Sequence, residues 1–308
     1  MRIALYSNSP LPVHGYGGTQ RVVVWLARGL VELGHQVTVL APAGSRLREA
    51  HVIGLDLEAI RRPDFNVSRY LPEGIDILHA HARLPSPPAH PFVFTLHGNR
   101  QDGTAASNTI FLSADHARRH GSTTFVYNGV DPSEYIFRSP KDGYDLFLGR
   151  LHSVKGYRWA IHGARRSGKT LVVAGGWRPS WRRSLRYEGS VDGTRKAELL
   201  AGADCLWMPA LWEEPFGLTL VEAMMSGTPV LGTRRGALPE VVSPDGGLLG
   251  DTLDELVRLR ADIEWMDSEA CRKRAETYFN HIRMAERYVR MYWEYLTTSR
   301  LPSGETLS

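Results

Sequence analysis

Residues 205–229 read CLWMPALWEEPFGLTLVEAMMSGTP, and this stretch carries the signals of one strand-to-helix unit. The apolar run at its start is typical of a buried strand, and Pro215 and Gly217 predict a bend after it. A helix is expected over 218–225, because no helix breaker interrupts the run before Gly227. A buried strand that leads into a helix is the building unit of a parallel sheet covered on both faces.

The rest of the chain repeats this alternation of short apolar runs and helical patterns. Strands are expected at 2–7, 36–41, 75–81, 92–97, 109–112 and 123–127, and again at 145–148, 170–174, 185–189, 205–209 and 229–232. Helices are expected at 19–33, 157–166, 195–203, 218–225 and 252–261, and over most of 268–298. Periodicity is weak from 131 to 143, which predicts a domain boundary there. Two doubly wound α/β domains in tandem would face each other across a cleft, with ligands at the carboxyl ends of the strands.

Length and composition indicate a globular protein of two domains, because 308 residues is roughly twice the usual domain size of about 150. The net charge of +4 is too small to predict a nucleic-acid partner. Cys205 and Cys271 form no C-x-x-C motif, so we predict no disulfide framework and no thiolate zinc site, and a cytoplasmic location. No signal peptide or membrane-spanning run is recognised, so we expect at most peripheral membrane contact.

Two carboxylates flank the predicted helix start. Glu214 precedes the helix and Glu222 lies about one turn inside it, while the amides of Gly217, Leu218 and Thr219 would face the cleft. A helix N-terminus is an anion site, and carboxylates beside it can accept hydrogen bonds from sugar hydroxyls. The alternative is that both acids are placed only to suit the helix dipole.

Two further loops follow predicted strands. Gly149 allows a sharp turn, and Arg150 and Lys155 place two cations beside a helix start, which suits a diphosphate. The alternative is a solvated basic loop. In the first domain, Gly17 and Gly18 would let the backbone approach a phosphate or a sugar closely.

Taken in order, these segments resemble the retaining glycosyltransferases of family four (glycosyl transferases group 1), which have the GT-B fold. The resemblance covers nearly the whole chain and rests on E-x7-E at Glu214 and Glu222, on 149–156, on the Gly17-Gly18 loop, and on 77–81, 96–98 and 127–131. It implies two Rossmann-like domains, an acceptor-side domain over 1–134 and a donor domain over 143–284. It also implies a C-terminal helix, at about 285–300, that crosses back to the first domain.

The resemblance further implies a role for each matching residue. Arg150 and Lys155 would hold the donor diphosphate, and Glu222 would accept the ribose hydroxyls. Glu214 would contact hydroxyls of the donor sugar. The backbone amides near that sugar would be those of Phe216, Gly217, Leu218 and Thr219.

The remaining implied contacts are with the base, the diphosphate and the reacting carbon. His97 would lie at the reacting face of the sugar, and Gly17 and Gly18 would approach the diphosphate from the first domain. Base contacts would be made largely by the backbone near Ser190 and Val191. The reaction implied is hexosyl transfer from a UDP- or GDP-type donor to a sugar, lipid-linked or small-molecule acceptor, with retention, no metal and no cofactor.

The sequence departs from the family pattern in two places. The chain is short between His97 and Ser113, where a helix of the acceptor domain is usual, so the acceptor site would be more open or completed by a partner. Gln20 stands where an acid is frequent, so no role is expected for that position.

Other patterns are interpreted as structural. Residues 163–170 match G-x-x-x-x-G-K-T, but they close a helix and open a strand, which is the reverse of a phosphate loop. His79 and His81 share one face of a strand without further ligands, so a metal site is not predicted. Residues 177–186 mix tryptophan with arginine. They could touch an anionic membrane or an acidic acceptor, but we favour a solvated loop whose tryptophans cover the core edge.

Three other function classes are alternatives to a glycosyltransferase. An NAD-dependent oxidoreductase would need an acid at the end of the second strand, where residues 39–42 read VLAP. A sugar-nucleotide epimerase or hydrolase of the same fold is poorly separated by sequence. A non-catalytic binding module is disfavoured by the full set of Arg150, Lys155, Glu214 and Glu222.

Overall fold

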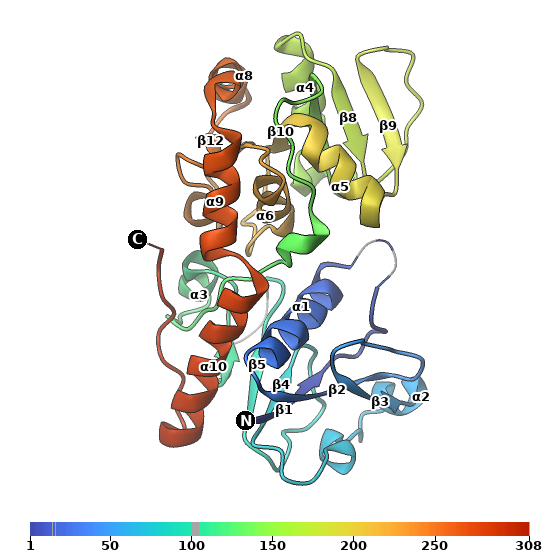
Figure 1. Cartoon of the computed structure of the whole chain (residues 1–308), viewed down its shortest axis with the longest axis vertical. Helices are drawn as coiled ribbons and strands as arrows, with labels where there is room; N and C mark the ends of the chain where they lie inside the picture. The colour runs from blue at the N-terminus through green and yellow to red at the C-terminus, as the bar shows by residue number, and fades with distance from the viewer. Residues whose placement is uncertain (14, 16, 100–104, 308) are drawn as a thin grey trace. The chain divides into compact units, whose positions relative to one another are not determined.

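The computed structural model describes residues 1–13, 15, 17–99 and 105–307. The chain divides into two units: the first consists of Met1–Gly129 and His281–Ser308, and the second of Val130–Asn280 (Figure 1). Each unit contains one six-stranded sheet in which every paired strand is parallel to its neighbour. The predicted α/β class with two Rossmann-like domains is therefore confirmed.

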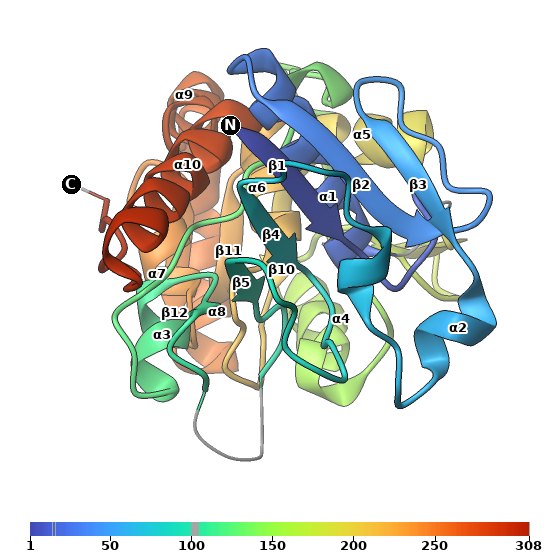
Figure 2. The ribbon, with the colours of Figure 1, turned by 90° about the horizontal axis from the view of Figure 1, so that it is seen from below.

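The sheet of the first unit has the strand order β3-β2-β1-β4-β5-β6 (Figure 2). Its strands are β1 (Arg2–Tyr6), β2 (Gln36–Pro42), β3 (His51–Leu55), β4 (Ile77–Ala80), β5 (Phe92–Thr95) and β6 (Thr109–Ile110). The order 3-2-1-4-5-6 is that of the dinucleotide-binding fold, with its switch point between β1 and β4. His79 lies opposite Leu5 of β1 and Val93 of β5, so it stands in the middle of the sheet.

The helices of the first unit are α1 (Gly18–Glu32), α2 (Leu57–Arg61), α3 (Ala114–Arg119) and α10 (His281–Thr298). The C-terminal helix α10 packs against α1. Gly29 permits this contact, because a Cβ there would lie 2.6 Å from the carbonyl oxygen of His281. One face of α10 is buried, including Met284, Tyr288 and Tyr292. The predicted return of the last helix to the first domain is confirmed.

The sheet of the second unit has the strand order β12-β11-β10-β7-β8-β9. Its strands are β7 (Tyr144–Leu148), β8 (Leu171–Ala174), β9 (Leu185–Gly189), β10 (Ala203–Met208), β11 (Val230–Thr233) and β12 (Gly247–Gly250). Its helices are α4 (Tyr157–Arg166), α5 (Gly193–Gly202), α6 (Leu218–Met225), α7 (Leu238–Val241), α8 (Leu253–Asp262) and α9 (Ser268–Tyr278).

A buried polar cluster fixes the centre of this second sheet. Asp145 of β7 accepts a hydrogen bond from Trp207 Nε1 at 2.7 Å and from Arg260 Nη2 at 2.7 Å, and all three side chains are buried. Breaking a buried charge pair by removing one partner typically costs about 3–5 kcal/mol. The cluster therefore specifies how β7, β10 and α8 meet, which in turn fixes the loops that follow β7 and β10.

The structure differs from the sequence predictions at weakly patterned segments. His51–Leu55 and Gly247–Gly250 are strands that were not predicted, because each is short and contains glycine. Residues 123–127 were predicted as a strand, but only an isolated bridge forms there. The predicted helix over 268–298 is two helices, since it is interrupted at Phe279.

No helix in the described part of the chain is both long enough and apolar enough to span a bilayer.

Candidate functional site

The start of α6 is shaped by one glycine. Gly217 adopts φ 86°, a left-handed conformation that other residues rarely take, and it is the N-cap of α6. A Cβ at this position would lie 2.7 Å from Leu220 Cδ1. The side chain of Phe216 is buried, with its ring centroid 5.8 Å from that of Phe279, whereas Leu218 and Thr219 are partly exposed. The first amides of a helix have no acceptor within the helix, so they create a positive potential at this end.

Glu214 lies beside this helix start and is the centre of a charged cluster. Its Oε2 accepts hydrogen bonds from Lys155 Nζ at 2.6 Å and from Trp212 Nε1 at 2.9 Å. The ammonium of Lys155 also lies 4.8 Å from the centre of the Trp212 ring. Glu214 is only 7% exposed, and a buried carboxylate is stable only when it is paired, so these contacts hold it in place. Two residues that were assigned from separate motifs, Lys155 and Glu214, are therefore in direct contact.

A second glycine brings the Lys155 loop to the Glu214 loop. The 3₁₀ turn Ser153–Lys155 ends at Gly156, whose φ is 71°. A Cβ on Gly156 would lie 1.8 Å from the carbonyl oxygen of Pro209, just after β10. Between the same two loops, the amide of Leu211 donates to the carbonyl of Val154 at 2.8 Å. The cation and the carboxylate are thus positioned by backbone contact as well as by their ion pair.

Glu222 is buried on α6 and has its own polar partners. Its Oε1 accepts hydrogen bonds from Lys196 Nζ at 2.6 Å and from the Tyr135 hydroxyl at 2.9 Å. The Lys196 ammonium lies 5.5 Å from the centre of the Tyr135 ring. These contacts fix the orientation of the carboxylate, since a buried charge is stable only when it is paired.

Sequence reasoning missed Lys196, Tyr135 and Trp212. A signal existed for Lys196, because it stands on the apolar face of α5 beside Ala197, and a lysine there needs a carboxylate partner. Tyr135 and Trp212 lie in segments without periodicity, so nothing in the sequence indicates what they contact.

The other predicted donor residues lie in loops at one edge of the same sheet. Arg150 is exposed and follows β7, and Ser190 and Val191 follow β9, while Glu214 follows β10. Because these strands are parallel, their carboxyl ends share one edge, which is where ligands bind in open α/β sheets. The structure therefore places Arg150 at the same edge of the sheet as Glu214.

In the first unit, His97 follows β5 and contacts a second histidine. Nε2 of His97 and Nδ1 of His81 are 2.9 Å apart, and His81 follows β4. Burial lowers the pKa of His97 to about 4 and lowers that of His81 well below its usual value. Both rings are therefore neutral at pH 7, and a single proton lies between these two nitrogens.

The other ring nitrogen of His81, Nε2, decides which histidine carries that proton. Its Nε2 is buried and has no hydrogen-bond partner within the described part of the chain. A proton on that nitrogen would be an orphaned buried N–H, which proteins rarely tolerate. We therefore assign the proton of His81 to Nδ1, from which it is donated to His97 Nε2. His97 then carries its own proton on Nδ1 and is a hydrogen-bond donor, not a base, at neutral pH.

A buried network behind His81 connects the sheet to α10. His79 Nδ1 lies 2.7 Å from the Tyr292 hydroxyl, and His79 Nε2 lies 2.7 Å from Thr95 Oγ1. Thr95 Oγ1 in turn lies 3.0 Å from the Tyr288 hydroxyl. His79 is thus fully engaged as a packed histidine. Among the described residues, no group of three or more His, Cys, Asp or Glu side chains is placed to hold a metal ion.

The glycine loop of the first unit leads directly into a helix. Gly18 is the first residue of α1 and Gly17 is its N-cap. A Cβ on Gly17 would lie 2.7 Å from Val13 Cγ2 and 2.8 Å from Gln20 Oε1, so the loop has no room for a side chain there. Residues 14 and 16 of this loop, and residues 100–104 of the shortened segment after His97, lie outside the described residues.

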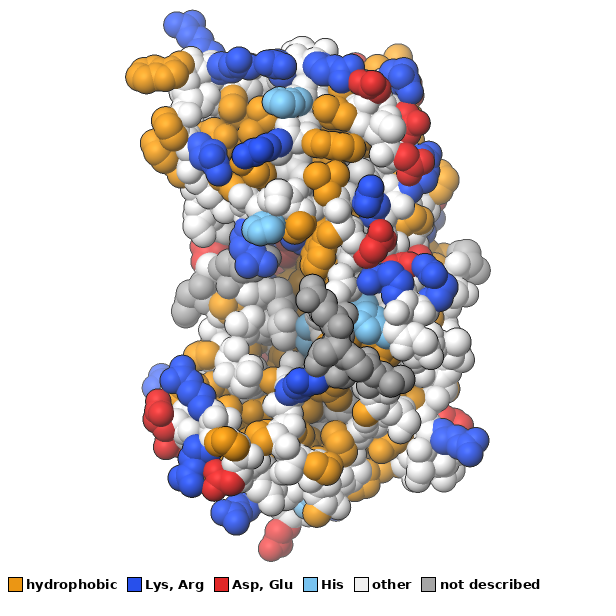
Figure 3. All heavy atoms as spheres, turned by 180° about the vertical axis from the view of Figure 1, so that it is seen from behind, with side chains coloured by type: hydrophobic (Ala, Val, Ile, Leu, Met, Phe, Trp, Pro, Cys, Tyr) orange, Lys and Arg blue, Asp and Glu red, His pale blue; other side chains and the backbone are white. Residues whose placement is uncertain are grey.

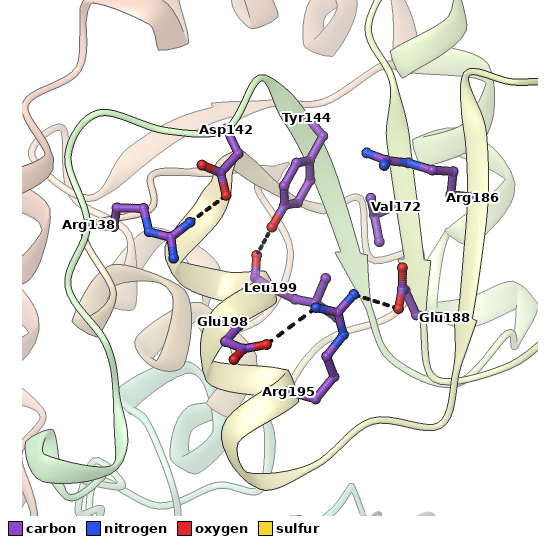
Figure 4. Close-up of a pocket in the computed structure, with 9 residues that line it drawn as sticks. All are labelled: Arg138, Asp142, Tyr144, Val172, Arg186, Glu188, Arg195, Glu198 and Leu199. Atoms are coloured by element: carbon purple, nitrogen blue, oxygen red, sulfur yellow. Dashed lines mark hydrogen bonds and ion pairs between the residues drawn. The ribbon is translucent and has the colours of Figure 1, made fainter.

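A cavity of about 240 Å³ in the second unit lies away from these residues (Figure 4). It is lined by α5, by β7, β8 and β9 and by the segment before β7, and two of its arginines are paired with carboxylates. Arg138 bonds Asp142 at 2.5 Å, and Arg195 bonds Glu188 at 2.8 Å (Figure 4). None of the predicted site residues lines it. With Arg138 and Arg195 already bound to carboxylates, the cavity is a weak candidate for an anion site.

Comparison with known proteins gives matches over both units. A family model described as Glycosyltransferase Family 4 matches residues 16–131, and one described as Glycosyl transferases group 1 matches residues 144–261. A phosphatidyl-myo-inositol mannosyltransferase of Mycolicibacterium smegmatis is 28% identical over 305 residues, covering 76% of this chain and 77% of that one.

Two further matches differ in how much they cover. Glycogen synthase of Mycobacterium tuberculosis strain H37Rv is 34% identical over 139 residues, so this chain matches 33% of its length. That match covers 39% of the present chain. The crystal structure of AviGT4, a glycosyltransferase involved in avilamycin A biosynthesis, superimposes with a TM-score of 0.80 at 27% identity, covering 98% of this chain and 99% of that one.

Proposed function

Because the chain belongs to the group 1 and family 4 glycosyltransferases and has the GT-B fold, we propose that it transfers a sugar from a nucleotide-diphosphate donor to an acceptor hydroxyl. The observation that carries this proposal is the cluster of Lys155, Glu214 and Trp212 beside the N-terminus of α6. It combines a cation, a carboxylate and a helix N-terminus at the edge of the sheet where ligands bind in open α/β folds.

The cation and the helix start suit a diphosphate leaving group. As the glycosidic bond breaks, negative charge grows on the phosphate oxygens, and preorganised positive groups stabilise it without reorganising. Lys155 has three N–H donors, so its hydrogen bond to Glu214 leaves donors that can reach a phosphate oxygen. Arg150, in the loop after β7, supplies a second cation with a geometry that matches phosphate.

The two glutamates serve different parts of the donor in this proposal. Glu214 lies beside the helix amides, where it accepts hydrogen bonds from hydroxyls of the sugar. Glu222 accepts the ribose hydroxyls, and Lys196 and Tyr135 keep its carboxylate in one orientation. The base is held by backbone groups near Ser190 and Val191, and the glycines at 17 and 18 approach the diphosphate.

His97 has a positioning role on the reacting sugar. With its proton on Nδ1, it donates a hydrogen bond to a sugar oxygen and does not remove a proton from the acceptor. We further propose that the reaction proceeds with retention and without a metal ion. Retention rests on family membership, while metal independence rests on Arg150, Lys155 and the α6 amides taking the part of a divalent cation.

A thermal-shift panel of UDP, GDP and ADP, followed by their sugars, tests donor binding. A ligand at one hundred times its dissociation constant adds roughly 2.7 kcal/mol to the free energy of unfolding. We expect one nucleotide diphosphate to stabilise the wild type and to stabilise Lys155→Ala much less. Lys169→Ala is the matched control, since Lys169 bonds Glu264 away from the cluster. If no nucleotide or nucleotide sugar raises the melting temperature, the proposed function is wrong.

A further inference from the structure

The loop between β8 and β9 carries two tryptophans that have no place in the core. Trp177 is 69% exposed and Trp181 is 100% exposed, and every residue from 177 to 184 is exposed. The expectation that these tryptophans cover the core edge is therefore wrong. Large aromatic side chains in full contact with water, clustered on one short loop, mark an interaction surface.

The same loop is strongly cationic. Residues 175–187 read GGWRPSWRRSLRY, with four arginines and no acidic residue. Arg182 and Arg183 form no ion pair with the described residues. Arg178 lies 5.4 Å from the centre of the Tyr157 ring, and Arg158 lies 5.8 Å from it, which adds a further cation at the base of the loop.

Figure 3 shows exposed hydrophobic and cationic side chains together at the upper end of the face it displays. On the side where β8 and β9 lie, Lys and Arg side chains mix with hydrophobic ones, while acidic side chains gather on the opposite side. The loop is also anchored at both ends. Before the loop, the amide of Gly175 donates to the carbonyl of Gly189 at 2.6 Å, and after it the amide of Leu171 donates to the carbonyl of Ser184 at 2.8 Å. The tryptophans are thus presented by a short, tethered segment.

We propose that this Trp–Arg loop, residues 177–183, docks the protein on a membrane surface rich in anionic phospholipid headgroups. Tryptophan prefers the membrane interface, where its ring contacts the acyl boundary and its N–H stays hydrated. Arginine binds lipid phosphate through two parallel N–H donors. The proposal concerns membrane binding alone and does not depend on the transferase reaction.

Nucleic acid fits this loop less well than lipid does. Binding a strand needs cations that follow the phosphate backbone over several nucleotides. The cavity beside α5 is lined in part by Glu188 and Glu198, and Arg195 is already paired with both of them. Arg182 and Arg183, which have no carboxylate partner in the described part of the chain, are neighbours on one compact loop, which suits a flat surface of headgroups better than a groove.

The chain offers a matched control in the same unit. Trp265 is 88% exposed, like the loop tryptophans, but Asp262, Glu264 and Asp267 surround it in the sequence. If exposed indole alone were sufficient, Trp265 would contribute to membrane binding. If anionic lipid is the partner, the acidic residues around Trp265 should prevent that tryptophan from contributing to binding.

The test is co-sedimentation of the full chain with vesicles of phosphatidylcholine, with or without phosphatidylglycerol. We expect the wild type to bind only the vesicles that contain phosphatidylglycerol, with a blue shift of tryptophan fluorescence. Arg182→Gln/Arg183→Gln should weaken binding by roughly 25-fold, at about fivefold per arginine. Trp177→Ala/Trp181→Ala should weaken it at least tenfold, whereas Trp265→Ala should bind as the wild type does.

Several outcomes would overturn this proposal. One is a wild type that does not sediment with anionic vesicles. Others are a Trp177→Ala/Trp181→Ala variant that binds as well as the wild type, or a Trp265→Ala variant that loses as much. Tighter binding of the wild type to a homopolymeric RNA than to the vesicles, lost in the loop variants, would assign the loop to nucleic acid instead. Circular dichroism checks that each variant is folded, which is expected because the substituted side chains are exposed.

Discussion

At the scale of single residues, the site depends on pairs that no single motif predicts. The sequence identified Glu214, Glu222 and Lys155 from local patterns, because a bend, a helix start and a basic loop are local features. Their partners could not be predicted in the same way. Lys196 reaches Glu222 across 26 positions of sequence, and Tyr135 reaches it across 87, so the contacts exist only once the chain has folded.

Lys155 is expected to matter for the rate more than for the fold. Lys155→Ala removes a donor aimed at the developing charge of the diphosphate, and such losses typically cost about 2.7–4 kcal/mol, or roughly 10²–10³ in rate. We expect kcat to fall by that factor, while Glu222→Ala mainly raises the KM for the donor. Lys169→Ala should leave both parameters within about twofold. Equal effects of Lys155→Ala and Lys169→Ala in steady-state kinetics would contradict the role given to Lys155.

His81 is expected to set the tautomer of His97. In the wild type, long-range ¹⁵N–¹H NMR correlations should show His97 protonated at Nδ1 at pH 7. His81→Leu removes the donor to Nε2, so the tautomers should mix and kcat should fall by about 5–30-fold, the equivalent of roughly 1–2 kcal/mol. His81→Asn keeps an N–H donor and should recover part of the loss. His97 protonated at Nε2 in the wild type would show that the proton has been assigned to the wrong ring nitrogen.

At the scale of elements, long sequence patterns predicted helices and strands correctly, whereas short patterns did not. The apparent phosphate loop at 163–170 closes α4 and opens β8, as its position relative to the helix predicted. The strands β3 and β12 escaped prediction because each is short and contains glycine, which weakens the alternation on which a prediction depends.

The helix α10 is expected to be essential for the first unit. From Ala285 onward it buries Tyr288, Met291 and Tyr292, and burying a large apolar side chain contributes about 1.5–3 kcal/mol. The hydroxyl of Tyr288 also hydrogen-bonds the buried Thr95, and the hydroxyl of Tyr292 hydrogen-bonds the buried His79. Deleting the chain from Ala285 onward should therefore expose apolar surface and cause aggregation. Deletion from Gly304 onward, which leaves α10 intact, is the control. Size-exclusion chromatography and thermal unfolding measure both, and a shortened chain as stable as the wild type would refute the expectation.

At the scale of the whole molecule, buried histidines make stability depend on pH. Burial lowers the pKa of His116 to about 3 and of His97 to about 4, and it lowers those of His79 and His81 well below 6.5. The unfolded chain therefore binds more protons than the folded chain between these values and 6.5. Stability is fully present above pH 6.5 and is lost as the pH falls toward 4.

For each buried histidine, the free energy of unfolding is expected to change by about 1.4 kcal/mol for each pH unit in this range. Between pH 6.5 and 5, each fully buried histidine should remove roughly 2 kcal/mol from the free energy of unfolding. Urea unfolding at the two pH values measures the total, and hydrogen exchange of β4 and β5 shows whether the loss falls on the first unit. A variant with His79→Gln should show a smaller pH dependence. A free energy of unfolding that does not change between pH 7 and 5 would contradict the burial of these rings as neutral groups.

The most direct test of the proposed activity is the transfer reaction itself, run in EDTA and followed by NMR. The protein is incubated with α-linked UDP-, GDP- and ADP-sugars and a panel of sugar and lipid-linked acceptors, and the anomeric proton of the product is assigned. We predict a product with the α configuration from one class of donor, formed without added metal and lost in Lys155→Ala. Release of free sugar without transfer, strict dependence on added magnesium, or a β-linked product would contradict the proposed mechanism.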